Sequence, residues 1–569
     1  MADSTFWIIA IDFGTAYSGY CYCVRSKPDA IRCPVWGEEH GQSTLKTPTC
    51  ILFDEQGNFR HFGYDALMTY KMNPQSKDSF FQNFKMDLYN KTISRHMVIT
   101  ASNQMPMSAM KVFSESLRYL KGHALEMVAH HTSGKKFIAS DVTWVLTVPA
   151  IWDPAAKQFM REAATKAGLV TETNSSHLII SLEPEAASAW CKQLPSKGFI
   201  AEGLQDTLEQ KPGTQYIVVD CGGGTVDIAV HKVLEGGFLK EIHKASGGDV
   251  GGSNVDNKFK SFLRDIFNYT LWDQYEADYP SELQKMMFDF TRYKCVKNNR
   301  DVFIPCPYSL SKLAEETKAM HEYFKDVEGV SWSEGSFKVT YSKLKTFYKD
   351  SLKQITKLIK EIFATPEINI NILFLVGGYA SSEILQEKIK RQFSQRCKIV
   401  CPVDAHLAVA KGAVRIGENP RIISSRVSAL TYGISEARTF DPSVHKEEKR
   451  RENNAKDYVY CTDLFHRFIQ KDEAVHYDDE REYEFSPINV DQISMTFRIF
   501  STEAPDATYI DDPGMKEIGS FSVSMPDISA GRNRRVKFQM RFGLTELQAK
   551  ATDLTSKETN KVHLDFLTK

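Results

Sequence analysis

Apolar residues in the first part of the chain gather in short runs, each followed by a helical pattern. Runs of this kind occupy residues 7–11, 142–148, 216–219 and 372–376. They are almost entirely apolar, which is typical of central strands that are covered on both faces. Gly, Asp or Pro follows each run, and helical patterns come next, for example at 154–167 and 384–393. This alternation predicts an α/β domain that extends to about residue 417.

Two stretches interrupt the alternation and are expected to be inserts. The first, at 46–138, is rich in Met and Phe and shows less strand signal than its flanks. The second, at 247–334, carries helical patterns at 255–267 and 282–296.

Beyond Pro420 the pattern becomes β-rich. Charge runs occupy 446–452 and 478–484. Polar and apolar residues alternate at 492–500, 518–525 and 535–542. Alternation with a period of two predicts half-exposed antiparallel strands. We therefore place a domain boundary near 418–426 and a β-rich domain at 427–569.

The composition, the length and the net charge exclude several classes of protein. Of the 569 residues, 42% are hydrophobic and 25% are charged, as in ordinary soluble proteins. The length exceeds the ~250–300 residues that one hydrophobic core supports. Lys and Arg number 71 and Asp and Glu 72, a net charge of −1, so no overall field draws the chain to nucleic acid or an anionic membrane. No apolar run approaches the ~18 residues of a membrane span.

The cysteines and the N-terminal residues indicate the cellular compartment of the protein. The 11 cysteines are scattered, with neither the spacing of a zinc site nor a disulfide framework. Free thiols are the simpler expectation, and they indicate a reducing compartment, the cytoplasm or the nucleus. The first apolar run ends at Asp12 and lacks a basic flank and a cleavage site. We therefore expect a strand there rather than a signal peptide.

Two Gly-rich turns carry the candidate chemistry. Residues 12–17 (Asp-Phe-Gly-Thr-Ala-Tyr) and residues 220–227 (Asp-Cys-Gly-Gly-Gly-Thr-Val-Asp) each follow an apolar run. Glycine lets the backbone turn tightly, and free N–H groups with a Thr hydroxyl can hold phosphate oxygens. Asp12 and Asp220 offer the oxygen ligands that a hydrated divalent cation prefers. Two such hairpins facing each other would hold a polyphosphate and its metal between two lobes.

A single turn of this kind is more often an ordinary tight β-turn. Two copies in separate parts of the chain, each after a buried strand, favour a paired site. Neither copy is a P-loop, because G-x-x-x-x-G-K-[ST] is absent. Neither is a dinucleotide fingerprint, because Asp227 stands where the last Gly is required.

Two further segments become stronger candidates for a functional site when they are considered together with these turns. The strand at 372–376 leads into Gly377 and Gly378, whose bare backbone could carry a base or a ribose. A strand at 178–182 leads to Glu183, and a carboxylate there could orient a water for attack on a terminal phosphate. Alone, the first segment is more often packing, and the second is more often a helix acid that complements the helix dipole.

In this order, the segments resemble the actin-like ATPase superfamily and, within it, the 70 kDa heat-shock proteins. The strings most similar to that family are 147–150, 220–227, 251–252, 376–378 and 408–413. Further segments resemble its divergent heat shock 70 kDa protein 12 branch, namely 84–86, 428–433 and 461–465. The resemblance covers nearly the whole chain and is strongest over 1–417.

The resemblance implies a fold and a function. Residues 1–417 would form a two-lobed, duplicated RNase H-like nucleotide-binding domain. The first lobe would be about 1–200 and the second about 214–417, with one insert each. Residues 427–569 would form a β-rich, substrate-binding-like domain without a full helical lid. ATP or ADP and Mg²⁺ would be the cofactors, and polypeptide clients and cochaperones the partners, in a chaperone role linked to the stress response.

The resemblance also implies roles for single residues. Asp12 and Asp220 would hold Mg²⁺ through water. Glu183, Asp220, Asp227 and Lys85 would serve catalysis. The residues implied around the nucleotide are Asp12, Gly14, Thr15, Ala16, Tyr17, Gly222, Gly223, Gly224, Thr225, Gly251, Gly252, Lys294, Gly377, Gly378 and Tyr379.

The chain departs from the family at the base site and at the linker. The family holds adenine between two arginine side chains, whereas Ser381 stands here where one of them is expected and Cys295 or a neighbour replaces the other. An arginine stack contributes about 0.5–2 kcal/mol, so we expect weaker base selectivity. The family's acidic and apolar linker is replaced by 419–426, Asn-Pro-Arg-Ile-Ile-Ser-Ser-Arg, which puts the usual coupling between the domains in question.

Three functions are compatible with the sequence. The first is a slow chaperone-like ATPase whose nucleotide state is coupled to the C-terminal domain. The second is a small-molecule kinase, such as a sugar kinase, which needs an acceptor pocket and has no obvious use for the β-rich end. The third is a scaffold that binds nucleotide without hydrolysing it.

Overall fold

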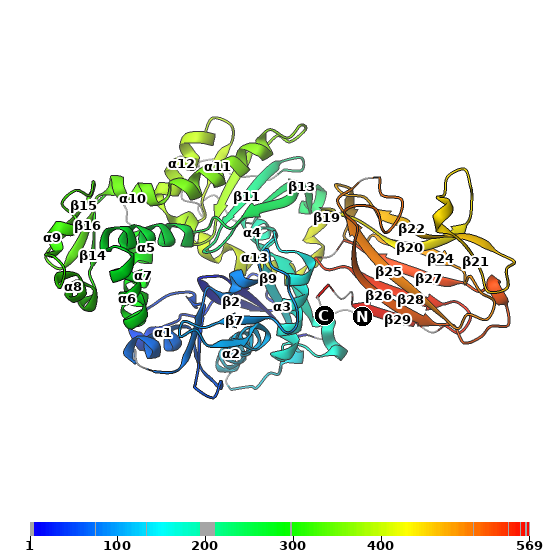
Figure 1. Cartoon of the computed structure of the whole chain (residues 1–569), viewed down its shortest axis with the longest axis horizontal. Helices are drawn as coiled ribbons and strands as arrows, with labels where there is room; N and C mark the ends of the chain where they lie inside the picture. The colour runs from blue at the N-terminus through cyan, green and yellow to red at the C-terminus, as the bar shows by residue number, and fades with distance from the viewer. Residues whose placement is uncertain are drawn as a thin grey trace. The chain divides into compact units, whose positions relative to one another are not determined.

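The computed structural model divides the chain into two compact units, and Figure 1 labels many of their helices and strands. One unit comprises residues 1–233 and 245–420, and the other comprises 234–244 and 421–569. The described residues are 5–73, 76–132, 134–193, 211–295, 299–504, 506–543, 545–557, 559–563 and 566–567. The lobe boundary expected near residue 200 lies outside them.

Two mixed sheets with the same topology form the centre of the first unit. In order across the sheet, the first consists of β10 (Leu178–Leu182), β9 (Val142–Val148), β1 (Trp7–Phe13), β2 (Tyr17–Val24) and β3 (Thr47–Pro48). In the corresponding order, the second contains β18 (Lys398–Val400), β17 (Ile372–Val376), β11 (Gln215–Cys221), β12 (Val226–Val233) and β13 (Leu239–Gly248). Each sheet combines an antiparallel hairpin, β1–β2 or β11–β12, with two parallel strands.

The apolar runs of the sequence are the central strands of these sheets. All residues of β1, β9 and β17 are buried, because helices or loops cover both faces of a central strand. The strands expected at 142–148, 178–182 and 372–376 are confirmed at both ends. The strands expected at 7–11 and 216–219 are longer, and therefore Asp12 and Asp220 lie within β1 and β11.

Helices that pack on the sheets set the position of the strand ends. They include α3 (Pro154–Lys166), α4 (Glu183–Cys191), α12 (Glu383–Phe393) and α13 (Ala408–Glu418), while α11 (Lys349–Phe363) packs on α12 and α10 (Tyr341–Phe347) packs on α11. The close packing of α4 on α13 requires glycine, since a Cβ on Gly412 would lie 1.6 Å from the carbonyl oxygen of Ala186. The helix that begins with Glu183 is therefore held firmly against its neighbour. Within the described residues, no helix combines the length and apolar character needed to cross a membrane.

The first insert contains more strand than the sequence indicated. It includes β4 (Cys50–Phe53), β5 (Phe59–Phe62), α1 (Gly63–Met72), β6 (Ser79–Gln82), β7 (Val98–Thr100), β8 (Pro106–Ser108) and α2 (Ala109–His131). Three of its strands form a sheet in the order β5-β4-β6. The expectation of little strand was wrong here, because strands of three or four residues are too short to show a clear period.

The second insert confirms its two expected helices but adds strands. Its elements are α5 (Ser253–Phe267), α6 (Tyr269–Asp278), α7 (Pro280–Tyr293), β14 (Val302–Pro305), α8 (Tyr308–Glu315), α9 (Met320–Tyr323), β15 (Val330–Ser333) and β16 (Ser336–Val339). The helix expected at 282–296 ends at Tyr293, and Val296 lies outside the described residues. The sheet β14-β16-β15 was not expected.

The second unit is a sandwich of antiparallel sheets. One sheet has the order β21 (Arg450–Glu452), β22 (Val459–Ile469), β20 (Thr431–Thr439), β25 (Ser494–Thr502) and β26 (Lys516–Ser524). The other has the order β24 (Glu480–Phe485), β27 (Val536–Arg541), β28 (Gln548–Asp553) and β29 (Thr559–His563). Apolar residues of both sheets, such as Ile499 and Phe538, share one core, which explains the period of two.

Two shorter strands complete the described part of the second unit. They are β19 (Ile423–Val427) and β23 (Ala474–His476). β19 pairs in parallel with Leu239 at the start of β13.

The charge run at 478–484 belongs largely to strand β24, which the sequence analysis missed because its apolar positions are few.

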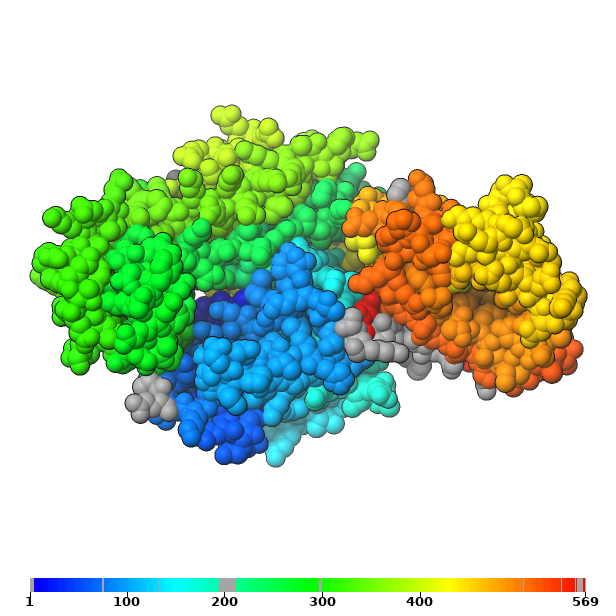
Figure 2. All heavy atoms as spheres, viewed as in Figure 1, coloured from blue at the N-terminus to red at the C-terminus, as the bar shows by residue number. Residues whose placement is uncertain are grey.

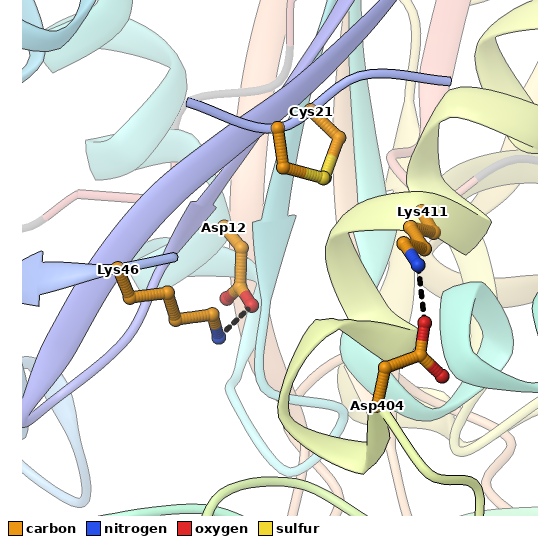
Figure 3. Close-up of a disulfide and its surroundings, with 6 residues drawn as sticks. Asp12, Cys21, Lys46, Asp404 and Lys411 are labelled. Carbon is orange, nitrogen blue, oxygen red and sulfur yellow. Dashed lines mark hydrogen bonds and ion pairs between the residues drawn. A yellow bond between two sulfur atoms is a disulfide. The ribbon is translucent and has the colours of Figure 1, made fainter. Parts of the chain in front are cut away.

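The expectation that all cysteines are free thiols was wrong for one pair. Cys21 in β2 forms a disulfide with Cys33, as Figure 3 shows. The chain turns back after β2, and Tyr22 and Arg32 exchange two backbone hydrogen bonds of 2.9 Å. This bridge brings the Cα atoms of the two cysteines to 4.5 Å, within the range for a disulfide. The other cysteines are free.

Candidate functional site

The two Gly-rich turns of the sequence face each other in the first unit. A Cβ on Gly223 would lie 2.8 Å from the Cβ of Ala16, and one on Gly224 would lie 2.6 Å from Thr15 Oγ1. Contacts this close exclude any side chain at the two glycines. The duplicated topology therefore brings the turns between β1 and β2 and between β11 and β12 into direct apposition.

Backbone hydrogen bonds fix the second turn to the start of α5. The N–H of Gly251 donates to the Gly224 carbonyl at 3.1 Å, and that of Gly252 donates to the Gly222 carbonyl at 3.0 Å. The N–H of Ser253 donates to the Gly223 carbonyl at 2.8 Å. This ladder holds the glycine turn in one conformation, as a preorganised anion site requires.

A third glycine contact places β17 beside the aspartate of the second turn. Gly377 has φ of +90°, and a Cβ there would lie 2.4 Å from Asp220 Oδ1. Only glycine combines this backbone conformation with such a close approach. The Gly377 expected on the nucleoside side therefore also abuts the carboxylate expected to bind metal.

These segments line one cavity of about 1790 Å³ in the first unit. In Figure 2 the surface is hollowed between the blue first lobe and the green segment that carries α5 to α7. Most of the expected site residues line it: Asp12, Gly14, Thr15, Ala16, Tyr17, Lys85, Glu183, Asp220, Gly222, Gly223, Thr225, Gly252, Lys294, Gly377, Gly378 and Tyr379. Gly224, Gly251 and Asp227 are not among the lining residues.

Lys85 and Glu183 form a buried ion pair at the end of β10. The Nζ of Lys85 lies 2.6 Å from Glu183 Oε1, and the two side chains are 2% and 10% exposed. The ammonium also lies 5.4 Å from the centre of the Trp152 ring. Lys85 is thus buried and paired rather than solvated. Glu183 is the first residue of α4, so it also stands where an acid complements the helix dipole, and that alternative for Glu183 stays open.

Asp12 has a different cationic partner, Lys46. The Lys46 Nζ lies 2.5 Å from Asp12 Oδ2, as drawn in Figure 3. Asp12 Oδ1 is 3.4 Å from the hydroxyl of Thr147 in β9. The sequence analysis had no signal for Lys46, because it lies outside every motif and meets Asp12 only through the pairing of β2 with β3.

Four carboxyl groups, those of Asp12, Glu183, Asp220 and Asp227, crowd this part of the site, and burial raises the pKa of the last three. Burial, with the charges of Asp227 and Asp12, raises the pKa of Glu183 to about 7 even though Lys85 opposes the shift. Burial and the charges of Glu183, Asp227 and Asp12 raise the pKa of Asp220 well above its usual range. Burial also raises the pKa of Asp227, although the N–H of Ile151 donates to it at 3.1 Å.

The donor set fits a divalent cation. Lys46 pairs with Asp12 and Lys85 pairs with Glu183, so among the described residues Asp220 and Asp227 form no ion pair with a lysine. Oδ2 of the buried Asp227 has no hydrogen-bond partner among the described residues. Mg²⁺ bound through water prefers oxygen ligands, and its charge would favour the ionised forms of the carboxyl groups whose pKa is raised here. Asp12 and Asp220, which both line the cavity, are the residues placed to hold it.

The nucleoside end is built from α5, α7 and the turn after β17. Lys294 Nζ lies 2.7 Å from Asp256 Oδ1 and 3.0 Å from the Gly252 carbonyl oxygen. Tyr379 is buried, and its hydroxyl lies 3.2 Å from Ser351 Oγ. The Asp256 partner was missed, although it lies three residues inside α5 and one helical turn from Gly252.

Cys295 and Ser381 lie next to each other at this end. The Ser381 hydroxyl interacts with the Cys295 thiol and offsets part of the rise that burial causes in the pKa of that thiol. Ser381 also donates to the Gly378 carbonyl at 2.7 Å. The two residues that stand where arginines were expected are therefore small and in mutual contact, and neither has a cationic face to place on a base.

Comparison with known proteins agrees with this geometry. The family model described as "Hsp70 protein" matches residues 8–440. Heat shock 70 kDa protein 12A of Mus musculus is 33% identical over 98% of this chain and 91% of its own length. Heat shock 70 kDa protein 12B of Homo sapiens is 31% identical over the same shares. The chain therefore belongs to the Hsp70 family, whose nucleotide-binding domain has the actin-like ATPase fold.

Proposed function

We propose that this protein is a Mg²⁺-dependent, chaperone-like ATPase in which the nucleotide state is coupled to the C-terminal unit. One observation carries the proposal: two glycine hairpins from duplicated sheets face each other beside a buried cluster of carboxyl groups on one cavity. Hsp70 proteins in general bind ATP or ADP with Mg²⁺. The residues that such binding needs are present here and lie together.

Each group has a distinct part in the proposed reaction. The N–H groups of the Gly222–Thr225 turn and the Thr15 hydroxyl bind phosphate oxygens. Asp12 and Asp220 would hold Mg²⁺ through water, and the ion would supply positive charge to the phosphates. Glu183 at the start of α4 orients the attacking water and accepts its hydrogen bond. Lys85 favours the anionic form of Glu183, because its ammonium lowers the pKa of that carboxyl.

Two other functions remain as alternatives. A sugar-type kinase would use the same phosphate hairpins, but it gives no role to the β-sandwich of the second unit. A scaffold that binds without hydrolysis is favoured by the contact between Cys295 and Ser381 at the base end. ATP turnover separates the three: a kinase requires an acceptor, an ATPase does not, and a scaffold shows none. Polypeptide clients, cochaperones, the stress response and a cytoplasmic location stay predictions.

We expect ATP or ADP with excess Mg²⁺ to raise the melting temperature of the protein. A ligand at 100 times its dissociation constant adds about 2.7 kcal/mol to the free energy of unfolding, so the shift should grow with nucleotide concentration. Differential scanning fluorimetry over a nucleotide series measures it. A protein that melts at the same temperature at all nucleotide concentrations would not be a nucleotide-binding protein.

We also expect weak discrimination between ATP and GTP. Without an arginine on either side of the base, binding lacks the contribution of about 0.5–2 kcal/mol that each stack would make. The dissociation constants for ATP and GTP should therefore differ by about tenfold or less. Competition calorimetry measures the ratio. The variant Ser381→Arg should favour ATP more strongly if the base lies at this end. A large preference for ATP in the unaltered protein would show that other groups read the base.

A further inference from the structure

The two hairpins differ at one equivalent position. Asp220 in β11 pairs with Asp227 in β12, whereas Asp12 in β1 pairs with Gly19 in β2. The second lobe therefore has two carboxyl groups side by side where the first lobe has only one. The absence of a side chain at Gly19 leaves space beside Asp12.

Lys46 fills that space. A Cβ on Gly19 would lie 3.0 Å from Lys46 Cγ and 3.5 Å from Lys46 Cα, so the lysine stem lies directly over the glycine. The stem leads the ammonium to Asp12 Oδ2 at 2.5 Å, and the side chain is 16% exposed. Figure 3 shows the Lys46 side chain reaching Asp12, and Lys46 directly precedes β3.

The charge of Lys46 acts on the cavity as well as on Asp12. It lowers the pKa of Asp220, although burial and neighbouring carboxylates dominate there. It also contributes, after burial, to the lowered pKa of His406. Lys46, Asp12, Asp220 and His406 all line the same cavity. An ammonium has three N–H donors, and Asp12 Oδ2 accepts one of them.

We propose that Lys46 is a built-in cation of the phosphate site, which makes nucleotide binding less dependent on a divalent ion. This inference rests on the proposed function. A metal-free nucleotide brings several negative charges to a site that already holds four carboxyl groups. Lys85 is engaged by Glu183, so Lys46 is the ammonium that offsets the charge at Asp12. Without it, repulsion at close range in a partly buried site would oppose the phosphates strongly.

The test is the dissociation constant of ADP measured by calorimetry in excess Mg²⁺ and in EDTA. We expect Lys46→Met to raise the ratio of the EDTA value to the Mg²⁺ value by about tenfold or more, equivalent to about 1.4 kcal/mol. Metal-free binding should account for most of the change. Lys46→Arg keeps the charge and should leave the ratio close to that of the unaltered protein.

A matched control and a second variant separate the charge from the fold. Lys411 is about as exposed as Lys46, pairs with Asp404 and is not among the residues that line the cavity, so Lys411→Met should leave the ratio unchanged. Gly19→Ala keeps both charges but pushes against the Lys46 stem, and it should raise the ratio by a smaller factor. Melting curves establish that each variant is folded.

The outcomes distinguish this inference from the function beneath it. If Lys46→Met binds ADP with an unchanged ratio, Lys46 is a structural ion pair only, and the inference is overturned while the proposed function stands. If the unaltered protein binds no ADP in either condition, both fall together. A ratio that rises in Lys46→Met and in Gly19→Ala, but not in Lys411→Met, supports the built-in cation.

Discussion

The variant Asp220→Asn is expected to lose nucleotide binding and yet to melt at a higher temperature than the unaltered protein without ligand. Asp220 is buried beside Glu183, Asp227 and Asp12, which raise its pKa well above the usual range. A neutral amide of the same shape removes this repulsion. Single substitutions that relieve a conflict of this kind commonly add about 0.5–2 kcal/mol to the free energy of unfolding, and we expect a gain of this order.

The same change removes a carboxylate that would hold Mg²⁺ through water. Loss of such an outer group typically costs about 10–100-fold in metal affinity, so the nucleotide-induced rise in melting temperature should disappear. Scanning fluorimetry with and without ATP and Mg²⁺ measures both effects. Asp78→Asn is the matched control, since Asp78 is a buried aspartate paired with Arg60 at 2.5 Å. It should lower the melting temperature and leave the nucleotide effect in place.

The second large effect is expected from Lys85→Met. It leaves Glu183 buried without its ammonium partner, and breaking a buried ion pair in this way typically costs about 3–5 kcal/mol. ATP hydrolysis in a single turnover should fall by about 10²–10⁴-fold, the usual contribution of a positioned acid or base. Equilibrium denaturation and rapid-quench kinetics measure the two losses.

The loss of stability in Lys85→Met should depend on pH. The pKa of Glu183 is already raised from 4.5 to about 7 in the folded protein, and removal of Lys85 raises it further. The folded state then binds a proton that the unfolded state releases, so the free energy of unfolding falls as pH rises from about 4.5 through the folded pKa. The loss should be small at pH 5.5 and large at pH 8.

The double variant Lys85→Met with Glu183→Gln checks this explanation. It has no charge to bury at position 183, so most of the stability should return and the pH dependence that comes from position 183 should disappear. Lys121→Met is the control, because Lys121 donates to the Ala167 carbonyl at 2.7 Å and has no part in the carboxyl cluster. If the double variant is as unstable as Lys85→Met alone, packing rather than charge explains the loss.

The positions of the central strands could be predicted because a strand buried on both faces is almost entirely apolar in sequence. The runs at 142–148, 178–182 and 372–376 match β9, β10 and β17. The missed strands are short or carry few apolar residues, as in β24 and the sheet β14-β16-β15. Their pairing depends on partners distant in the chain, and no local period reports it.

The disulfide was missed for a related reason. Cys21 and Cys23 are the cysteines closest to each other in the sequence. Side chains two residues apart in a strand point to the same face and cannot approach each other closely enough for a disulfide. The return of the chain after β2, bridged at Tyr22 and Arg32, brings Cys33 to Cys21 instead. Only the path of the loop decides that contact.

The sequence alone was enough to single out the two aspartates and the two Gly-rich turns and to indicate the family of the chain. Few residue types are compatible with a tight turn or with binding a metal ion, so such positions stand out in a sequence. The tertiary structure decided how these groups are charged. The apposition of the turns buries Glu183, Asp220 and Asp227 together, and the pairing of β2 with β3 delivers Lys46 to Asp12. Electrostatic interactions depend on distance and burial, and neither quantity is written in the order of residues along the chain.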